Sequence, residues 1–226
     1  MGGTSLRVEV LGPLRLTVDG AAVEVPGPKR RAVLALLALA EGHTVTVDHL
    51  VDALWPADAP DSARQALHTH VSRLRSRLGP AASRLQTRHD GYRLELAAGE
   101  LDMAEAKALL AAARSDPSAA LAPLRQAHAL WRGPVLADLT DLAPIAVAVE
   151  GCAHLQRAVT DALISAAVDA GQADAVVGLA AEAHGVDPLR EPAVLLLMRA
   201  LAATGRAPQA LRIGREYRRR LADETG

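Results

Sequence analysis

One stretch in the first half of the chain, "ARQALHTHVSRLRSRLG" at residues 63–79, alternates apolar and polar positions in a regular way. Its apolar residues recur at i, i+4, i+7 and i+11, which places them on one side of a helix with 3.6 residues per turn. These residues are Leu67, Val71, Leu74 and Leu78. The pattern predicts a helix that packs on a core through a narrow stripe, with Asp61 or Ser62 as its N-cap.

The residues before this helix predict a small sheet and two further helices. Short alternating runs in residues 6–25, with the turn residues Asp19-Gly20 between two of them, indicate strands. A helix is expected at about 29–41, and another opens at Asp48 and is closed by Pro56.

A second hairpin is expected after residue 79. Two β-like runs in "RLQTRHDGYRLEL" flank Asp90-Gly91. Strands, three helices and a hairpin in this order predict an α+β winged helix-turn-helix with an additional N-terminal sheet.

The second half changes to long Ala/Leu-rich segments. Gly171 in "AGQADAV" and Gly205 in "TGRAPQA" lie 34 residues apart, each between two helical runs, and Pro188 ends a helical turn. Thirty-four residues is the tetratricopeptide period. We therefore expect six or seven antiparallel helices in an all-α, tetratricopeptide-like domain at residues 98–226, following a winged-helix domain at residues 1–97.

Composition and charge narrow the function. The chain has no Phe, two Trp and two Tyr, so its core must be built from Ala, Leu and Val. The net charge is −1, which gives no general attraction to nucleic acid. Residues 64–93, however, contain seven arginines and a single acid, Asp90. The positive charge is local.

The polar side of the 63–79 helix has the distribution that a DNA-reading helix needs. Short hydrogen-bonding side chains and one arginine lie in the centre, and cations lie at the edges, where phosphates would be. The centre carries Gln65, Thr69, Ser72, Arg73 and Ser76; the edges carry His70, Arg77, Arg64, His68 and Arg75. An arginine-rich surface helix would look similar, but the hairpin adds further cations beside it, which favours DNA binding.

Other kinds of site find little support. Cys152 is the only cysteine, so we expect a buried structural thiol and neither a disulfide nor a cysteine zinc site. His68 and His70 point to different sides of one helix and are poor joint metal ligands. "GPKRR" lacks the spacing of a phosphate-binding loop, so its cations more simply start a helix, with phosphate or polymerase contact as their other role. We expect no metal, no cofactor and no enzyme activity.

The location of the protein is also indicated. The N-terminus lacks the apolar core of a signal peptide, and no apolar run reaches the ~18 residues of a membrane span. We expect a soluble, cytoplasmic protein with no membrane partner.

Several motifs in order resemble one family of regulators. "LGPLRLTVDGAAVEVPGPKRRAVLALLAL", "VDHLVDALWP", "HVSRLRSRLG" and "GYRLEL" look like an OmpR-type winged helix. "ALWRGPVLADL", "DPLREP" and "GRAPQALRIGREYRRRLADE" look like the bacterial transcriptional activator domain of the antibiotic regulatory protein (SARP) group. The resemblance implies an activator that binds direct repeats in double-stranded DNA as a homodimer. It also implies recruitment of RNA polymerase holoenzyme, including its sigma factor, at secondary-metabolite genes.

The resemblance also implies roles for individual residues. Arg73 is the expected base reader, and either Arg88 or His89 stands where such wings carry a groove-entering arginine. Phosphate contacts are expected mainly from Trp55, Gln65, His70, Arg75, Thr87 and Tyr92.

Two departures from the family pattern stand out. "MAEA" at residues 103–106 lacks the aromatic residue usual there. The chain also stops at "LADETG", where relatives continue with a Pro-containing segment, so the activator domain is expected to be truncated or taken from a larger regulator.

A rival reading comes from a different class of protein. In it, the chain is a helical-repeat interaction or ligand-sensing module whose winged helix docks protein. DNA binding with a steep salt dependence separates the two.

Overall fold

The computed structural model describes residues 4–57, 59–139 and 143–225. The chain forms two compact units. Unit 1 comprises Met1–Glu105 and Leu130–Ala153, and unit 2 comprises Ala106–Ala129 and His154–Gly226.

Unit 1 begins with the expected small sheet. Strands β1 (Leu6–Glu9), β2 (Arg15–Val18) and β3 (Ala21–Ala22) pair antiparallel in that order. Asp19 and Gly20 connect β2 to β3 with φ of 49° and 79°. Positive φ at both central residues suits the right-handed twist of a tight hairpin, so the predicted turn is confirmed.

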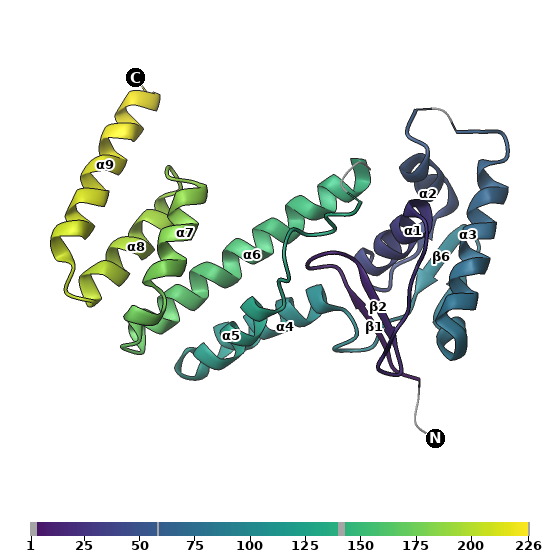
Figure 1. Ribbon diagram of the computed structural model, residues 1–226, viewed down its shortest axis with the longest axis horizontal. Coiled ribbons are helices and arrows are strands. Elements are labelled where there is room, and N and C mark those ends of the chain that lie inside the picture. The colour runs from purple at the N-terminus through teal and green to yellow at the C-terminus, as the bar shows by residue number, and fades with distance from the viewer. Residues whose placement is uncertain (1–3, 58, 140–142, 226) are drawn as a thin grey trace. The chain divides into compact units, whose positions relative to one another are not determined.

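Three helices follow, α1 (Pro28–Leu39), α2 (Val47–Leu54) and α3 (Ala63–Leu78), and Figure 1 shows them beside the strands. The predicted apolar stripe of α3 is confirmed, because each of its four residues is at most 1% exposed. Burying such side chains stabilises the fold by about 1.5–3 kcal/mol each.

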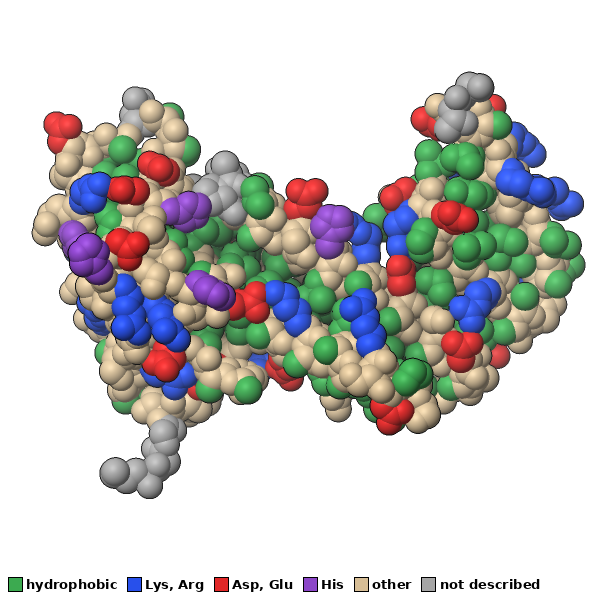
Figure 2. All heavy atoms as spheres, turned by 180° about the vertical axis from the view of Figure 1, so that it is seen from behind, with side chains coloured by type: hydrophobic (Ala, Val, Ile, Leu, Met, Phe, Trp, Pro, Cys, Tyr) green, Lys and Arg blue, Asp and Glu red, His purple; other side chains and the backbone are tan. Residues whose placement is uncertain are grey.

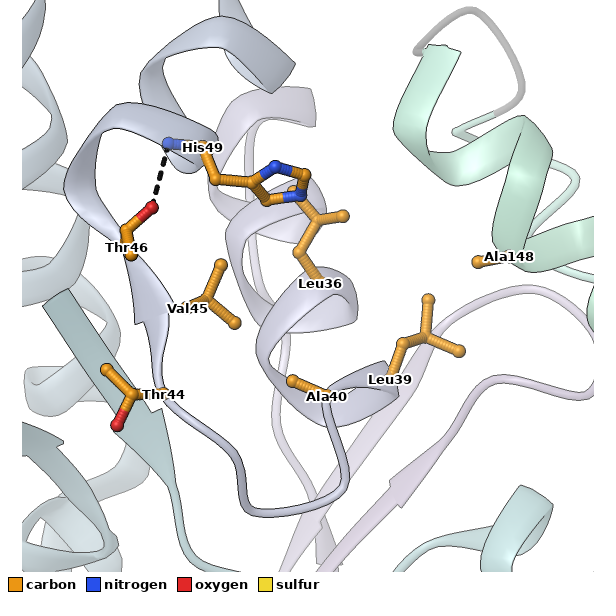
Figure 3. Close-up of a pocket in the computed structure, with 8 residues that line it drawn as sticks. All are labelled: Leu36, Leu39, Ala40, Thr44, Val45, Thr46, His49 and Ala148. Atoms are coloured by element: carbon orange, nitrogen blue, oxygen red, sulfur yellow. Dashed lines mark hydrogen bonds between the residues drawn. The ribbon is translucent and has the colours of Figure 1, made fainter.

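The helix expected to open at Asp48 begins one residue earlier, at Val47. The side chain of Thr46 caps it by accepting a hydrogen bond from the His49 N–H at 3.2 Å (Figure 3). Ser62 does occupy the N-cap position of α3, but its side chain makes no capping hydrogen bond. Its ψ of 9° lies outside the extended region in which a capping hydroxyl reaches the first turn.

The expected hairpin after α3 forms a second sheet. A 3₁₀ turn (Gly79–Arg84) leads into β5 (Leu85–Thr87) and β6 (Gly91–Leu94), and β4 (Val45–Thr46) pairs with the other side of β6. We call β5, β6 and the turn between them the wing. Together with α1–α3 it makes the predicted winged helix-turn-helix.

The second half of the chain is helical, as predicted. The residues from Asp102 to Thr225 that the structure describes contain six α-helices. These are α4 (Asp102–Ser115), α5 (Leu121–Ala129), α6 (Ala143–Asp169), α7 (Val177–Val186), α8 (Glu191–Ala203) and α9 (Ala207–Thr225).

The expected repeat is visible in the backbone. Gly171 follows α6 and Gly205 follows α8, with φ of 71° and 76°. At both positions the next residue donates its N–H to a carbonyl five residues earlier, at 2.8 Å. This is the hydrogen-bond pattern of a glycine helix stop, and it repeats after 34 residues.

Unit 1 is held together by a buried carboxylate, that of Asp102 at the start of α4. Asp102 is 0% exposed, and its two carboxylate oxygens accept the N–H groups of Val10 (2.8 Å) and Leu11 (2.9 Å). The guanidinium of Arg132 lies 3.7 Å away. Burial raises the pKa of the Asp102 carboxyl, while the N–H donors and Arg132 act in the opposite direction.

The segment Leu130–Leu139, which we call the strap, is bound to the same region. Arg132 N–H donates to Leu11 O at 2.9 Å, and Leu136 N–H donates to Gly12 O at 2.8 Å. Asp138 accepts from Leu14 N–H at 3.2 Å and from Arg31 Nε at 2.6 Å. These bonds cross the boundary expected after residue 97, and that boundary stays a prediction.

Asp102→Ala should lower the free energy of unfolding by about 3 kcal/mol or more, because it leaves buried N–H groups without an acceptor. Asp102→Asn keeps one acceptor oxygen and should lose less. Urea denaturation of both variants measures the difference. An alanine variant as stable as the parent chain would show that this carboxylate does not hold unit 1 together.

Candidate nucleic-acid interface

The central polar residues of α3 are all exposed. They are Gln65, Thr69, Ser72, Arg73 and Ser76. Thr69 and Ser76 donate their hydroxyl hydrogens to the carbonyls of Gln65 (3.0 Å) and Ser72 (3.2 Å). Their hydroxyl oxygens are thereby left as acceptors, while Gln65 and Arg73 offer donors, so this face can meet both kinds of group on a base edge.

The cations expected at the edges of α3 behave differently from one another. Arg77 is exposed. Arg64 is also exposed and pairs with Asp48 of α2. His68 bonds through Nδ1 to the hydroxyl of Tyr92 on β6.

Arg75 points toward the wing. Its Nε donates to Leu85 O at 2.9 Å and its Nη2 to Thr87 Oγ1 at 2.8 Å. Two bonds from one guanidinium fix the direction of β5 relative to α3. Arg75 and Thr87, both expected at phosphate, thus meet each other in the free protein.

Tyr92 lies beneath this connection. Its side chain is 3% exposed, and the Arg75 guanidinium lies 6.0 Å from its ring. Burial raises the pKa of the Tyr92 hydroxyl, and Arg75 acts in the opposite direction. Its hydroxyl bonds to His68, so Tyr92 joins β6 to α3, and the phosphate contact expected of it stays a prediction.

Trp55 contacts side chains from two helices, α1 and α3. Lys29 Nζ lies 4.0 Å from the centre of its ring, which is cation–π distance, and His70 stacks on it at 6.4 Å with an interplanar angle of 29°. Lys29 belongs to the first turn of α1, where the sequence analysis assigned it mainly to starting the helix. The structure places Lys29 beside Trp55. The basic motif "GPKRR" was the only feature of the sequence that could have pointed to this residue.

The charge near Trp55 affects His70. Burial lowers the pKa of the imidazole, and Arg30, Lys29 and Arg73 lower it further. Its Nδ1 has no hydrogen-bond partner among the residues that the structure describes. A negative group placed beside His70 would relieve this repulsion.

The wing tip carries Arg88 and His89, both exposed. Arg88 N–H closes the turn on Gly91 O at 2.8 Å, and its guanidinium contacts Gln86 Oε1. Figure 2 shows Lys, Arg and His side chains gathered on unit 1. The structure thus brings the α3 centre, Trp55 and the wing together around the basic stretch.

Gly91 has a role that its place beside the turn does not suggest. It begins β6 instead of turning the chain, and a Cβ there would lie 2.0 Å from Val45 O and 2.8 Å from Thr46 Cα. A residue with a side chain would push β4 away from the wing.

Unit 1 also has an open hollow of about 470 Å³, lined by none of the residues predicted to contact DNA (Figure 3). It is lined by Leu36, Leu39, Ala40, Thr44, Val45, Thr46, His49 and Ala148. Apart from two threonines and one histidine the lining is apolar. It lacks the convergent polar groups of a specific small-molecule site.

Comparison with known proteins gives two family matches. Residues 98–226 match the family described as "Bacterial transcriptional activator domain", and residues 23–94 match "Transcriptional regulatory protein, C terminal". Within the described residues, no helix is long and apolar enough to cross a membrane.

Three relatives are similar over nearly the whole chain. Regulatory protein AfsR of Streptomyces coelicolor is 40% identical over 98% of this chain, and transcriptional regulator RedD of the same organism is 30% identical over 99%. The structure of Mycobacterium tuberculosis EmbR in complex with a low-affinity phosphopeptide superposes with a TM-score of 0.89 at 33% identity, covering 99% of this chain. The chain spans 23% of AfsR, 67% of RedD and 61% of the EmbR chain.

Gly91→Ala should lower the free energy of unfolding by about 2 kcal/mol or more, because the new methyl group collides with the β4 backbone. Gly178→Ala in α7 is the matched control, since its Cβ would meet nothing within 4 Å and alanine favours helix. Urea denaturation compares them. Equal stability of the two variants would contradict the close approach of β4.

His70 should make the fold less stable in mild acid. Because its folded pKa is lowered below about 6.5, the unfolded chain takes up a proton that the folded chain refuses as pH falls through that range. His70→Gln should therefore lose less stability between about pH 7.5 and 5.5 than the parent chain. Denaturation at each pH measures it, and identical pH profiles would refute the shift.

Proposed function

Because the chain belongs to the SARP family of transcriptional regulators, which join an OmpR-type DNA-binding domain to a bacterial transcriptional activator domain, we propose that it is a sequence-specific DNA-binding activator. The observation that carries the proposal is the exposed centre of α3 with the wing bound to its edge through Arg75. Arg73, two residues before Arg75, is exposed.

In the proposed complex α3 lies in the major groove. Arg73 donates to O6 and N7 of a guanine, and Gln65, Thr69, Ser72 and Ser76 lie over neighbouring base edges. Arg64, Arg77, Trp55 and His70 face phosphates on either side. Lys29 joins them, since it already lies over Trp55.

The wing reaches the adjacent groove or backbone. Arg88 or His89 enters it at the tip. Arg75, Thr87 and Tyr92 keep the wing at the right distance from α3, and any phosphate contact they make adds to that role.

The finer steps of activation extend this proposal. Two chains occupy a direct repeat as a homodimer, with the activator domain at residues 98–226 joining them, and the bound pair recruits RNA polymerase holoenzyme through its sigma factor. The genes controlled are those of secondary metabolism. Linking two half-sites raises the effective concentration of the second chain, which favours repeats over single sites.

Selection of bound duplexes from a random pool, using the full chain, tests the proposal directly. A preferred sequence should emerge, and log K for it should fall with log salt by about 0.9 per phosphate contact. If no duplex sequence were enriched and log K did not change with log salt, the DNA-binding proposal would be wrong and the winged helix would instead be a protein-docking surface.

Arg73→Ala should weaken binding to the selected duplex by about 1–3 kcal/mol and relax the preference at one base pair. Arg77→Ala, one turn later on the same helix and equally exposed, should weaken selected and random duplexes alike and make the salt slope shallower by about one unit. Arg75 is unsuited as the control, because its loss also frees β5. If Arg77→Ala changed base preference and Arg73→Ala did not, the assigned reading face would be wrong.

A further inference from the structure

Three leucines of unit 2 are exposed. Leu195 of α8 is 50% exposed, and Leu211 and Leu221 of α9 are 61% and 39% exposed. On α8, Leu195 lies nearly opposite the buried core residue Leu197, two residues later. On α9, Leu211 lies about 100° around the helix from the buried Ala210, whereas Leu221 follows Ala210 at i+11 and lies on the core side. Leu195 and Leu211 therefore add exposed apolar surface outside the packed sides of α8 and α9, which packing of the core does not require.

Leu195 and Leu211 border a groove between α8 and α9. It has a volume of about 220 Å³ and is lined by Glu191, Val194, Leu195, Met198, Leu211, Gly214, Tyr217 and Arg218. Gly214 brings the walls together, since a Cβ there would lie 2.9 Å from Met198 Cε. We call this the α8–α9 groove.

The α9 wall of the groove is strongly basic. Arg215 and Arg218 follow Leu211 at i+4 and i+7, so they lie on its side of the helix, with Arg212 and Arg219 next to them. All four are exposed. In the described chain no carboxylate lies within ion-pair distance of any of them, whereas Arg220, on another side of α9, pairs with Glu216 at 2.6 Å.

The combination selects one kind of occupant. An amphipathic helix fits apolar side chains spaced at three and four residues into such a groove, and acidic residues beside its apolar stripe would meet the arginine row. A second copy of this face would bring arginine against arginine. A phosphate backbone would leave the leucines without an apolar partner.

We propose that the α8–α9 groove binds an amphipathic helix of another protein, with Asp and Glu along one edge of its apolar stripe. The surface lies in unit 2 and uses none of the residues assigned to DNA, so it stands apart from the proposed DNA reading.

The test uses the full chain and a labelled helical peptide of about 18 residues, a length comparable to that of α9. The peptide carries leucine at every third or fourth residue and glutamate beside that stripe. Fluorescence anisotropy should show saturable binding. A lysine-for-glutamate peptide should bind at least about tenfold more weakly, and the affinity of the glutamate peptide should fall with salt.

Substitutions in the groove should weaken this binding, each by about tenfold. Leu211→Ser removes an apolar contact, and a doubly substituted Arg215→Glu, Arg218→Glu chain reverses the charge. Val186→Ser, 86% exposed on α7, and Arg114→Glu, exposed on α4, are matched controls that should bind as the parent chain does. All four should retain the binding of selected duplex DNA, which separates this proposal from the previous one.

Three results would overturn the inference. The first is equal binding of the glutamate and lysine peptides. The second is a self-associated state in sedimentation that Leu211→Ser abolishes, which would assign the face to a second copy of this chain. The third is displacement of the peptide by random duplex DNA from the parent chain but not from the doubly substituted one, which would assign the arginine row to nucleic acid.

Discussion

The buried carboxylate of Asp102 is the interaction on which unit 1 depends. A carboxylate with no exposed surface needs partners for both oxygens, and the backbone N–H groups of Val10 and Leu11 provide them just beyond β1. This fixes where β1 ends and where α4 starts. Arg132 can then come within 3.7 Å of the same carboxylate and lie against Gly12, where a Cβ would be 3.1 Å from the arginine Cβ.

The effects of this contact extend to α1. The strap that contains Arg132 also contains Asp138, which binds Arg31. Lys29, Arg30 and Arg31 are consecutive in the first turn of α1. Arg31 binds the strap, Lys29 lies over the ring of Trp55, and the charges of Lys29 and Arg30 act on His70. The surroundings of Trp55 are therefore set by residues that lie far along the chain, and α3 completes them through His70.

The sequence was most informative where the signal was local. The α3 stripe, the Asp19-Gly20 turn and the repeated stops at Gly171 and Gly205 could be predicted, because each depends on periodicity or on a backbone conformation that few residues adopt. The bonds of Asp102 could not, since the acceptor and its donors are 92 and 91 residues apart. The same reason applies to Gly91, whose neighbour is β4, and to Arg75. Its place on the helix edge predicted a phosphate contact but not the hydrogen bond that it donates to Leu85 O of the wing. A helical wheel shows direction around an axis but not what lies there.

The Arg31–Asp138 pair has a consequence for any attempt to move this DNA-binding unit into another regulator. A splice after the last strand of the winged helix would exchange the strap for foreign sequence and leave Arg31 beside an unrelated side chain. The first turn of α1 would then lose its anchor, although every residue of the winged helix had been kept. A chimera that transplants the unit intact must carry Leu130–Leu139 along with it, or supply an acid at the position of Asp138.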